Sequence, residues 1–284
     1  MAVSTTRRAI LTLDQREESS RSDELAVEAP LSLVHNGETI AILMRMPGHD
    51  IELAAGWLVV ESGVRGRDDI SRLRECHDVG GDEVHLSLAP GVRPPQPRAF
   101  VTSASCGVCS ADAIDLAPVR TSEPHRLGWQ VTRQVLAELP ASMRTRQRTF
   151  DRTGAVHAAA LASVDGELLV VREDVGRHNA VDKVIGWALL EGRLPATDHL
   201  LVVSGRVSFE IVQKAVAAGV AGIVAVSAPS SLAVDLAREY DLLLAGLVRA
   251  PRLNLYAGAA YVRDRATAPS AECAAAAPSG PIPR

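Results

Sequence analysis

The second half of the chain alternates runs that are apolar at nearly every position with segments whose apolar residues repeat at helical spacing. Four such runs lie at positions 168–171, 199–203, 223–226 and 242–245. Strands of this kind are typical of a parallel sheet that is covered on both faces, and the intervening helices supply the covering layers. The pattern therefore predicts an α/β three-layer domain.

The first half of the chain indicates a hairpin followed by a helix. Asn36-Gly37 is a preferred two-residue hairpin turn, and it separates the strand-like segments 31–34 and 39–45. Asp50 is expected to cap a helix that ends near Gly63. This mixture predicts an α+β unit that is smaller than the α/β domain behind it.

Four regions follow from these patterns. The α+β domain is predicted over residues 25–125 and the α/β domain over 126–263. Residues 1–24 are charged and short of apolar side chains, and residues 264–284 are rich in Ala, Pro and Ser. Such segments bury too little apolar surface to offset the entropy of ordering, so both are predicted to be disordered.

Two further assignments concern helices. The alanine-rich segment 157–163 is predicted to be a short helix. Residues 131–139 and 143–150 also have helical character, and Pro140 is expected to interrupt them, because proline removes a backbone donor.

Composition excludes several classes of function. The 284 residues carry a net charge of −4 with acids and bases mixed, which gives no nucleic-acid footprint and no basic membrane-binding stripe. No run reaches the roughly 18 apolar residues of a transmembrane helix, and no signal peptide is recognised. Four cysteines do not make a disulfide scaffold in a chain of this length, so a reducing cytoplasm is predicted.

Cys106 and Cys109 form a Cys-x-x-Cys pair among small and hydroxylated residues. Such a pair can bind metal, cycle between dithiol and disulfide, or carry sulfur on one thiolate. A structural zinc site has four protein ligands, commonly two Cys-x-x-Cys pairs, and a second such pair is missing from the sequence. The weak helix that follows does not fit a thioredoxin-like dithiol. The pattern favours a mobile thiol loop that carries sulfur, and no metal site is assigned.

Two turns in the C-terminal half are candidates for binding an anion. Ser204-Gly-Arg206 and Ser227-Ala-Pro-Ser-Ser231 each connect the carboxyl end of a predicted strand to a helix. Ligands of open α/β sheets bind at that edge, and helix N-termini with an arginine suit phosphate. Ordinary helix capping by Ser208 and Ser230 is the alternative explanation for these serines.

A third candidate is Leu247-Val-Arg-Ala-Pro-Arg252, where Arg249 and Arg252 flank a proline. Fixed bidentate donors suit phosphate or an acceptor-rich heterocycle. The alternative is that two exposed arginines are merely solvated.

The densest polar cluster is Glu173-Asp-Val-Gly-Arg-His-Asn179, with Asp182 and Lys183. His178 and Asp182 lie one helical turn apart and are predicted to share a hydrogen bond. A functional site and a solvated, salt-bridged helix start explain this cluster equally well.

Several long motifs together resemble the signature blocks of the formate dehydrogenase accessory sulfurtransferases, the FdhD family. The resemblance runs from about Leu25 to Val262. The motifs are Ser105-Cys-Gly-Val-Cys109, Thr153-Gly-Ala-Val-His-Ala-Ala-Ala160, Arg172-Glu-Asp-Val-Gly-Arg-His-Asn-Ala-Val-Asp-Lys183, Val203-Ser-Gly-Arg-Val-Ser-Phe-Glu210 and Ser227-Ala-Pro-Ser-Ser-Leu232.

This resemblance implies a sulfurtransferase. Members receive persulfide sulfur from a cysteine desulfurase and pass it to the molybdenum of the bis-molybdopterin guanine dinucleotide cofactor, which is destined for formate dehydrogenase. It implies that Cys106 carries the persulfide, that Cys109 assists, and that Leu247, Val248, Arg249, Ala250, Pro251 and Arg252 bind the cofactor. Ser204, Arg206 and Ser227 are assigned to the same ligand on the bottom-up grounds above.

The resemblance also implies a C-terminal domain like the cytidine deaminase fold, and a homodimer. Deamination itself is rejected, because His157-Ala-Ala159 lacks the glutamate of the zinc deaminase motif and the Cys-x-x-Cys pair precedes it. A cofactor chaperone without covalent sulfur transfer and a zinc-binding module are the alternatives.

Overall fold

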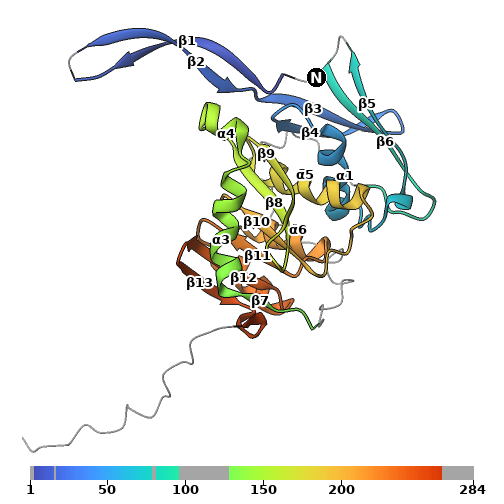
Figure 1. Cartoon of the computed structure of the whole chain (residues 1–284). Coiled ribbons are helices and arrows are strands. Elements are labelled where there is room, and N and C mark those ends of the chain that lie inside the picture. Colours follow the sequence, from blue (N-terminus) through green and yellow to red (C-terminus); the bar gives the residue numbers. More distant parts are fainter. Residues whose placement is uncertain (1–2, 16, 79–80, 96–127, 264–284) are drawn as a thin grey trace, which may run out of the picture.

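The computed structural model describes residues 3–15, 17–78, 81–95 and 128–263, and Figure 1 shows the arrangement of its elements. A six-stranded sheet at the centre has the order β13-β12-β11-β10-β8-β9. Its strands are β8 (His157–Ser163), β9 (Leu168–Asp174), β10 (His199–Val203), β11 (Gly222–Ala225), β12 (Leu243–Arg249) and β13 (Arg252–Ala257).

This central sheet is mixed, whereas the sequence predicted a parallel one. Strands β10, β11 and β12 are parallel neighbours, as expected. Strand β8 is antiparallel to both β10 and β9, and β13 is antiparallel to β12. The prediction failed because segment 157–163 was assigned to a helix. Pairing with a strand on each side overrides the helix propensity of its alanines.

Helices cover both faces of the central sheet, which confirms the three layers. One face packs against α3 (Arg133–Arg144). The other packs against α5 (Arg177–Leu190), α6 (Phe209–Ala217) and α7 (Ser231–Glu239). Neighbouring strand residues alternate between the two cores, as Leu200 and Leu201 do.

Helix α3 runs through Pro140, so the predicted interruption there is wrong. Leu136, Leu139 and Met143 are all buried against the sheet, and this packing on both sides of the proline offsets the lost hydrogen bond. The short helix α4 (Arg148–Thr153) follows after a brief turn.

The N-terminal half forms a four-stranded sheet of order β4-β3-β6-β5 with one helix, so the α+β prediction is confirmed. Its elements are β3 (Ala29–His35), β4 (Glu38–Arg45), α1 (Asp50–Glu61), the 3-10 turn η1 (Arg67–Asp69), β5 (Ile70–Asp78) and β6 (Gly81–Leu88). Asn36 and Gly37 have φ of 52° and 86° and form the predicted hairpin turn. Asp50 does not cap α1 as predicted, because its carboxylate is buried against Arg45 at 2.7 Å.

The two halves share one hydrophobic core. Residues of β3 and α1 belong to the same buried cluster as residues of β10 and α5. Helix α1 crosses α5 at two glycines: a Cβ at Gly56 would lie 1.9 Å from the carbonyl oxygen of Asp182, and one at Gly186 would lie 1.8 Å from that of Glu52. The predicted boundary near residue 125 falls outside the described residues.

An arm precedes this core, where the sequence predicted disorder over residues 1–24. Strands β1 (Thr5–Leu13) and β2 (Glu18–Ala26) form an antiparallel hairpin that projects from the body in Figure 1. The disorder prediction is wrong because the hairpin register places Arg7 opposite Glu24 and Arg8 opposite Asp23, which neutralises charges that looked unfavourable in sequence. Residues 264–284, predicted to be disordered, lie outside the described residues.

A two-stranded parallel ladder joins the start and the end of the C-terminal half. Strand β7 (Val131–Thr132) pairs with β14 (Val262–Arg263), which follows the 3-10 turn η2 (Ala259–Tyr261). Among the described residues, no helix is long and apolar enough to cross a membrane.

Candidate functional site

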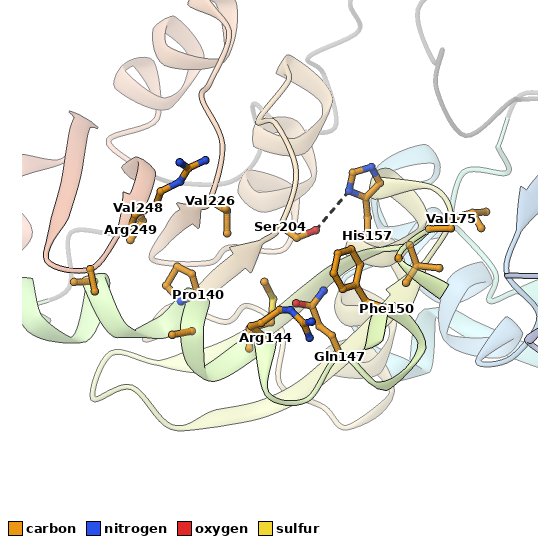
Figure 2. A pocket seen from close by; sticks show the side chains of 17 residues that line it. Pro140, Arg144, Gln147, Phe150, His157, Val175, Ser204, Val226, Val248 and Arg249 are labelled. Carbon is orange, nitrogen blue, oxygen red and sulfur yellow. Dashed lines mark hydrogen bonds between the residues drawn. The ribbon is translucent and has the colours of Figure 1, made fainter. Parts of the chain in front are cut away.

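A cavity of about 670 Å³ opens at the carboxyl edge of the parallel strands. Figure 2 shows that residues of α3 and α4 face the ends of β10, β11 and β12 across it. The size lies within the usual range for small-molecule sites. The lining residues labelled in Figure 2 are Pro140, Arg144, Gln147, Phe150, His157, Val175, Ser204, Val226, Val248 and Arg249.

The structure brings some of the predicted site residues to this cavity and leaves others beside it. Ser204, Val248, Arg249 and Ala250 line the wall. The remaining predicted ligand-binding residues do not line it; these are Arg206, Ser227, Leu247, Pro251 and Arg252.

Ser204 sits where β10 leaves the sheet, and it is held from both sides. Its hydroxyl oxygen accepts a hydrogen bond from the amide of Ala158 at 2.9 Å, and its own amide donates to the carbonyl of Ala158 at 3.0 Å. The same hydroxyl lies 3.5 Å from Nδ1 of His157, as the dashed line in Figure 2 marks. Ser204 thus holds the start of β8 in place and contacts the Nδ1 side of the His157 ring.

His157, which the sequence placed in a short helix and not among the site residues, also lines the cavity. Burial lowers the pKa of its imidazole, and the positive charge of Arg177 lowers it further. The wall therefore presents a neutral ring at pH 7, with one nitrogen able to donate and the other able to accept. A Cβ at Gly205 would lie 3.3 Å from Nδ1 of His157, so the glycine leaves room for the ring.

The hairpin between β12 and β13 carries the two predicted arginines. Arg249 and Arg252 are direct cross-strand neighbours, and both are exposed. Like charges in that arrangement repel each other, and an anion bound between them would relieve the repulsion. Leu247, just before, is 42 % exposed and has φ of 51°, at an irregularity of the strand pair.

Helix α4 forms the rim opposite this hairpin, and a residue of the polar cluster anchors it. The carboxylate of Glu173 accepts hydrogen bonds from the amides of Thr149 and Phe150, each at 2.8 Å. A carboxylate at a helix N-terminus satisfies amides that lack intrahelical partners. Arg144 pairs with Asp151 at 2.6 Å and lies over the Phe150 ring at 4.7 Å.

The rest of the polar cluster is buried or, at Arg177 and His178, half-buried, so it is not a solvated helix start. Asp174 and Lys183 pair at 2.7 Å with no solvent exposure of either side chain. The Lys183 amine also donates to the carbonyl of Met46 at 2.9 Å, and Asp174 accepts from the Met46 amide at 3.1 Å. This pair ties the end of β4 to α5, which is a structural role.

The predicted hydrogen bond between His178 and Asp182 is wrong. His178 instead lies 3.0 Å from the carboxylate of Glu210 and 3.1 Å from the hydroxyl of Ser208. Asp182 pairs with Lys214 at 2.7 Å. Burial raises the pKa of Asp182 despite this partner.

Capping explains one of the two serines for which it was the alternative. Ser230 accepts a hydrogen bond from the amide of Ala233 and caps α7. Ser208 occupies the cap position of α6, but its side chain makes no capping hydrogen bond.

The two candidate thiols, Cys106 and Cys109, lie outside the described residues. Cys76, on β5, is a half-buried free thiol. Residues 3–15, 17–78, 81–95 and 128–263 contain no cluster of three or more His, Cys, Asp or Glu suited to a metal ion.

Sequence reasoning missed the wall contributed by α3 and α4. Pro140, Gln147 and Phe150 are of ordinary residue types, and their sequence spacing gives no signal of a shared cavity. Only the packing of α3 against the sheet brings them to the strand ends.

Comparisons with known proteins identify the class. The model of the FdhD/NarQ family matches residues 26–263, and the chain belongs to that family. A protein named sulfur carrier protein FdhD from Nocardia farcinica is 46% identical over 266 residues, covering 92% of this chain and 95% of its own. A protein of the same name from Sulfolobus acidocaldarius is 39% identical over 238 residues, covering 84% and 90%.

A solved structure has the same fold. It is described as a candidate formate dehydrogenase accessory protein from Desulfotalea psychrophila, and it covers 92% of this chain and 100% of its own with a TM-score of 0.75 at 21% identity. The likeness to the cytidine deaminase fold stays a prediction.

Proposed function

We propose that this protein is a sulfurtransferase that carries sulfur as a persulfide on Cys106 and delivers it to the molybdenum of bis-molybdopterin guanine dinucleotide, for use by formate dehydrogenase. Membership of the FdhD/NarQ family supports the proposal, as do the relatives named sulfur carrier proteins. The single structural observation that carries it is the cavity at the strand ends, which Ser204, His157 and Arg249 line.

The two thiols, Cys106 and Cys109, account for every sulfur atom and electron in the proposed transfer. The Cys106 thiolate attacks the terminal sulfur of a cysteine desulfurase persulfide. The S–S bond of that persulfide breaks, the desulfurase cysteine is released as a thiolate, and the Cys106 persulfide forms. Delivery as sulfide needs two electrons. Attack of the Cys109 thiolate on the inner sulfur of Cys106 supplies them and leaves a Cys106–Cys109 disulfide, which a dithiol reductant then reopens.

The cavity is proposed to hold a guanine nucleotide end of the cofactor, which is the substrate here. Arg249 and Arg252 supply bidentate donors for its diphosphate. The neutral ring of His157 and the apolar wall from α3 suit a heterocycle that needs both a donor and an acceptor. Arg206, Ser227, Leu247 and Pro251 remain proposed contacts of the parts of the ligand beyond the wall.

The proposed setting is the cytoplasm, and the proposed assembly is a homodimer. The partners are a cysteine desulfurase and formate dehydrogenase; neither nucleic acid nor a membrane is proposed as a partner.

The test uses intact-mass analysis after incubation with a cysteine desulfurase and cysteine. We expect a gain of one sulfur atom in the wild type, none in Cys106→Ala, and an unchanged gain in the matched control Cys76→Ala. Formate dehydrogenase activity in cells should disappear with Cys106→Ala and stay unchanged with Cys76→Ala.

Three results would contradict the proposal. Full formate dehydrogenase activity in Cys106→Ala cells would exclude the persulfide, and guanine nucleotide binding without sulfur uptake would identify a cofactor chaperone instead. Tight stoichiometric zinc on the purified protein would favour the zinc-binding alternative.

A further inference from the structure

The N-terminal arm, defined as residues 3–15 and 17–27, carries an unusual share of exposed apolar surface. Six large apolar side chains are exposed in the described part of the chain, and four of them lie on this arm. Leu11 is 59 % exposed and Leu13 is 65 % exposed. Both lie near the tip of the hairpin that stands away from the body in Figure 1.

The base of the arm is fastened to the body. The guanidinium of Arg152, on α4, binds the carboxylate of Glu24 and the hydroxyl of Thr5. In the described residues, β1 and β2 pair only with each other. An isolated two-stranded hairpin is marginally stable in water, so nine-residue strands of this kind gain from a further partner.

The two edges of the arm differ in their chemistry. Strand β2 carries Glu18, Arg21, Asp23 and Glu24, and charges of this kind protect an edge against pairing. Strand β1 has no acid, lysine or proline, and its last five residues, 9–13, are uncharged and include the strand-favouring Ile10 and Thr12. The β1 edge is therefore the unprotected one.

We infer that the β1 edge pairs antiparallel with the β1 edge of a second copy of this chain, forming a four-stranded sheet across a two-fold axis. Full overlap of strands that run from Thr5 to Leu13 places the axis at Ala9. Arg7 of each copy then faces Leu11 of the other, and Arg8 faces Ile10.

Charge favours this arrangement over the other pairings of the same edge. All positive charge of β1 lies in Arg7 and Arg8, and the antiparallel register sets both against apolar residues whose surface their methylenes can cover. A parallel, in-register pair would set each arginine against its own copy, which is destabilising. The contact is isologous and is separate from the sulfur chemistry and from a dimer of C-terminal domains.

Engineered disulfides test the register directly in the full chain with its four native cysteines replaced by serine. Cα atoms of directly opposed residues in an antiparallel pair lie about 4.5–5.5 Å apart, within the range that a disulfide bridges. Under a mild oxidant, Ala9→Cys should therefore form a covalent dimer, read by non-reducing electrophoresis. Thr12→Cys is the matched control on the same strand, because its two copies would be about 20 Å apart.

A mixture of two cysteine variants gives a second test of the register. The register opposes Thr12 to Thr6 of the second copy, so a mixture of Thr12→Cys and Thr6→Cys proteins should form the mixed disulfide, while Thr12→Cys by itself does not. No dimer from Ala9→Cys, or equal dimer from Ala9→Cys and Thr12→Cys, would overturn the inference.

A charge pair tests the contact without oxidation. Leu11→Arg would face Arg7 of the second copy, and Leu11→Glu would face the same arginine with opposite charge. We expect Leu11→Arg to weaken association between labelled arms at least about 5-fold relative to Leu11→Glu, measured by energy transfer at 50 mM salt. Equal affinities would contradict the register.

Discussion

The two faces of the central sheet are covered in different ways. On one face, α5, α6 and α7 cover the sheet, α1 of the N-terminal half packs against α5, and buried ion pairs such as Asp174–Lys183 bind the layers together. On the other face, α3 is the main cover, and the cavity opens between α3, α4 and the strand ends. Asp174 and Lys183, from the polar motif that looks most like a reactive site in the sequence, thus have a structural role on the closed face, while Glu173 of the same motif anchors α4 at the cavity rim. The cavity lies on the more thinly covered face and is walled by ordinary residues.

The glycine crossing on the closed face should be the most sensitive point. In Gly186→Ala, the new Cβ would lie 1.8 Å from the carbonyl oxygen of Glu52, so α1 and α5 must separate. We expect a loss of at least about 4 kcal/mol or failure to fold, measured by thermal unfolding and yield of folded protein. In the control Gly66→Ala, the Cβ meets open space at φ of −140°, and the midpoint should stay near that of the wild type. Equal midpoints for the two variants would refute the close crossing.

Breaking the buried ion pair between Asp174 and Lys183 should cause the next largest loss of stability. Lys183→Met leaves the Asp174 carboxylate buried without its cation and should cost about 3–5 kcal/mol in urea unfolding. The double variant Asp174→Asn/Lys183→Met should recover part of this loss. For comparison, Asp23→Asn removes an exposed partner of Arg21 and should change stability by less than about 1 kcal/mol. A similar small effect for Lys183→Met would mean that water reaches the pair.

On the open face, a change should alter binding and leave stability intact. Ala141 is exposed on α3 and lines the cavity, so Ala141→Trp should fill it. With GDP as the probe, we expect the Kd to rise at least about 10-fold by calorimetry, equivalent to about 1.4 kcal/mol. Ala260→Trp, at an exposed site outside the cavity lining, is the control. Unchanged GDP binding in Ala141→Trp would remove the nucleotide from this cavity.

The smallest expected effect is a pH dependence of the ion pair between Glu52 on α1 and Arg172 on β9. Burial would raise the pKa of Glu52, but hydrogen bonds from Arg172 at 2.5 and 2.7 Å outweigh it and lower the pKa. A lowered folded-state pKa adds stability above the unfolded value, and that stability is lost as pH falls through the folded-state pKa. Glu52→Gln should therefore cost about 1 kcal/mol at pH 7 and progressively less below pH 4.5 in urea unfolding. A constant difference from pH 7 to pH 3 would show that the ion pair contributes nothing.

Local patterns in the sequence predicted most elements of the fold, because strands and helices with clear periodicity need little context. The three parallel strands, the Asn36-Gly37 turn and the three layers follow from such patterns. Strand β8 could not be predicted in this way, because alanine favours a helix locally and only the pairing with β9 and β10 makes it a strand. The arm was missed because its charges cancel only across the hairpin register.

Part of the site was predictable from strand direction, because the carboxyl ends of parallel strands lie at the same edge of a sheet. Ser204 was expected at the carboxyl edge because parallel strands end together, and it lines the cavity. Arg249 was predicted separately, as a bidentate donor in the segment 247–252, and it lines the same cavity. The roles of His178, Asp182 and Lys183 were not predictable, because sequence spacing suggested partners within one helix while the real partners lie on other segments. The Cys106 and Cys109 predictions still await a test.

The ladder between β7 and β14 brings the first and last strands of the C-terminal half side by side. Residues 131 and 262 are direct neighbours across two parallel strands, so the path that begins at α3 returns to its own starting point. A new connection there would need only a short linker, while new termini could be opened at an exposed turn such as the one at Gly166. The order of elements along this path could thus be rearranged without moving α3 or the strand ends that wall the cavity.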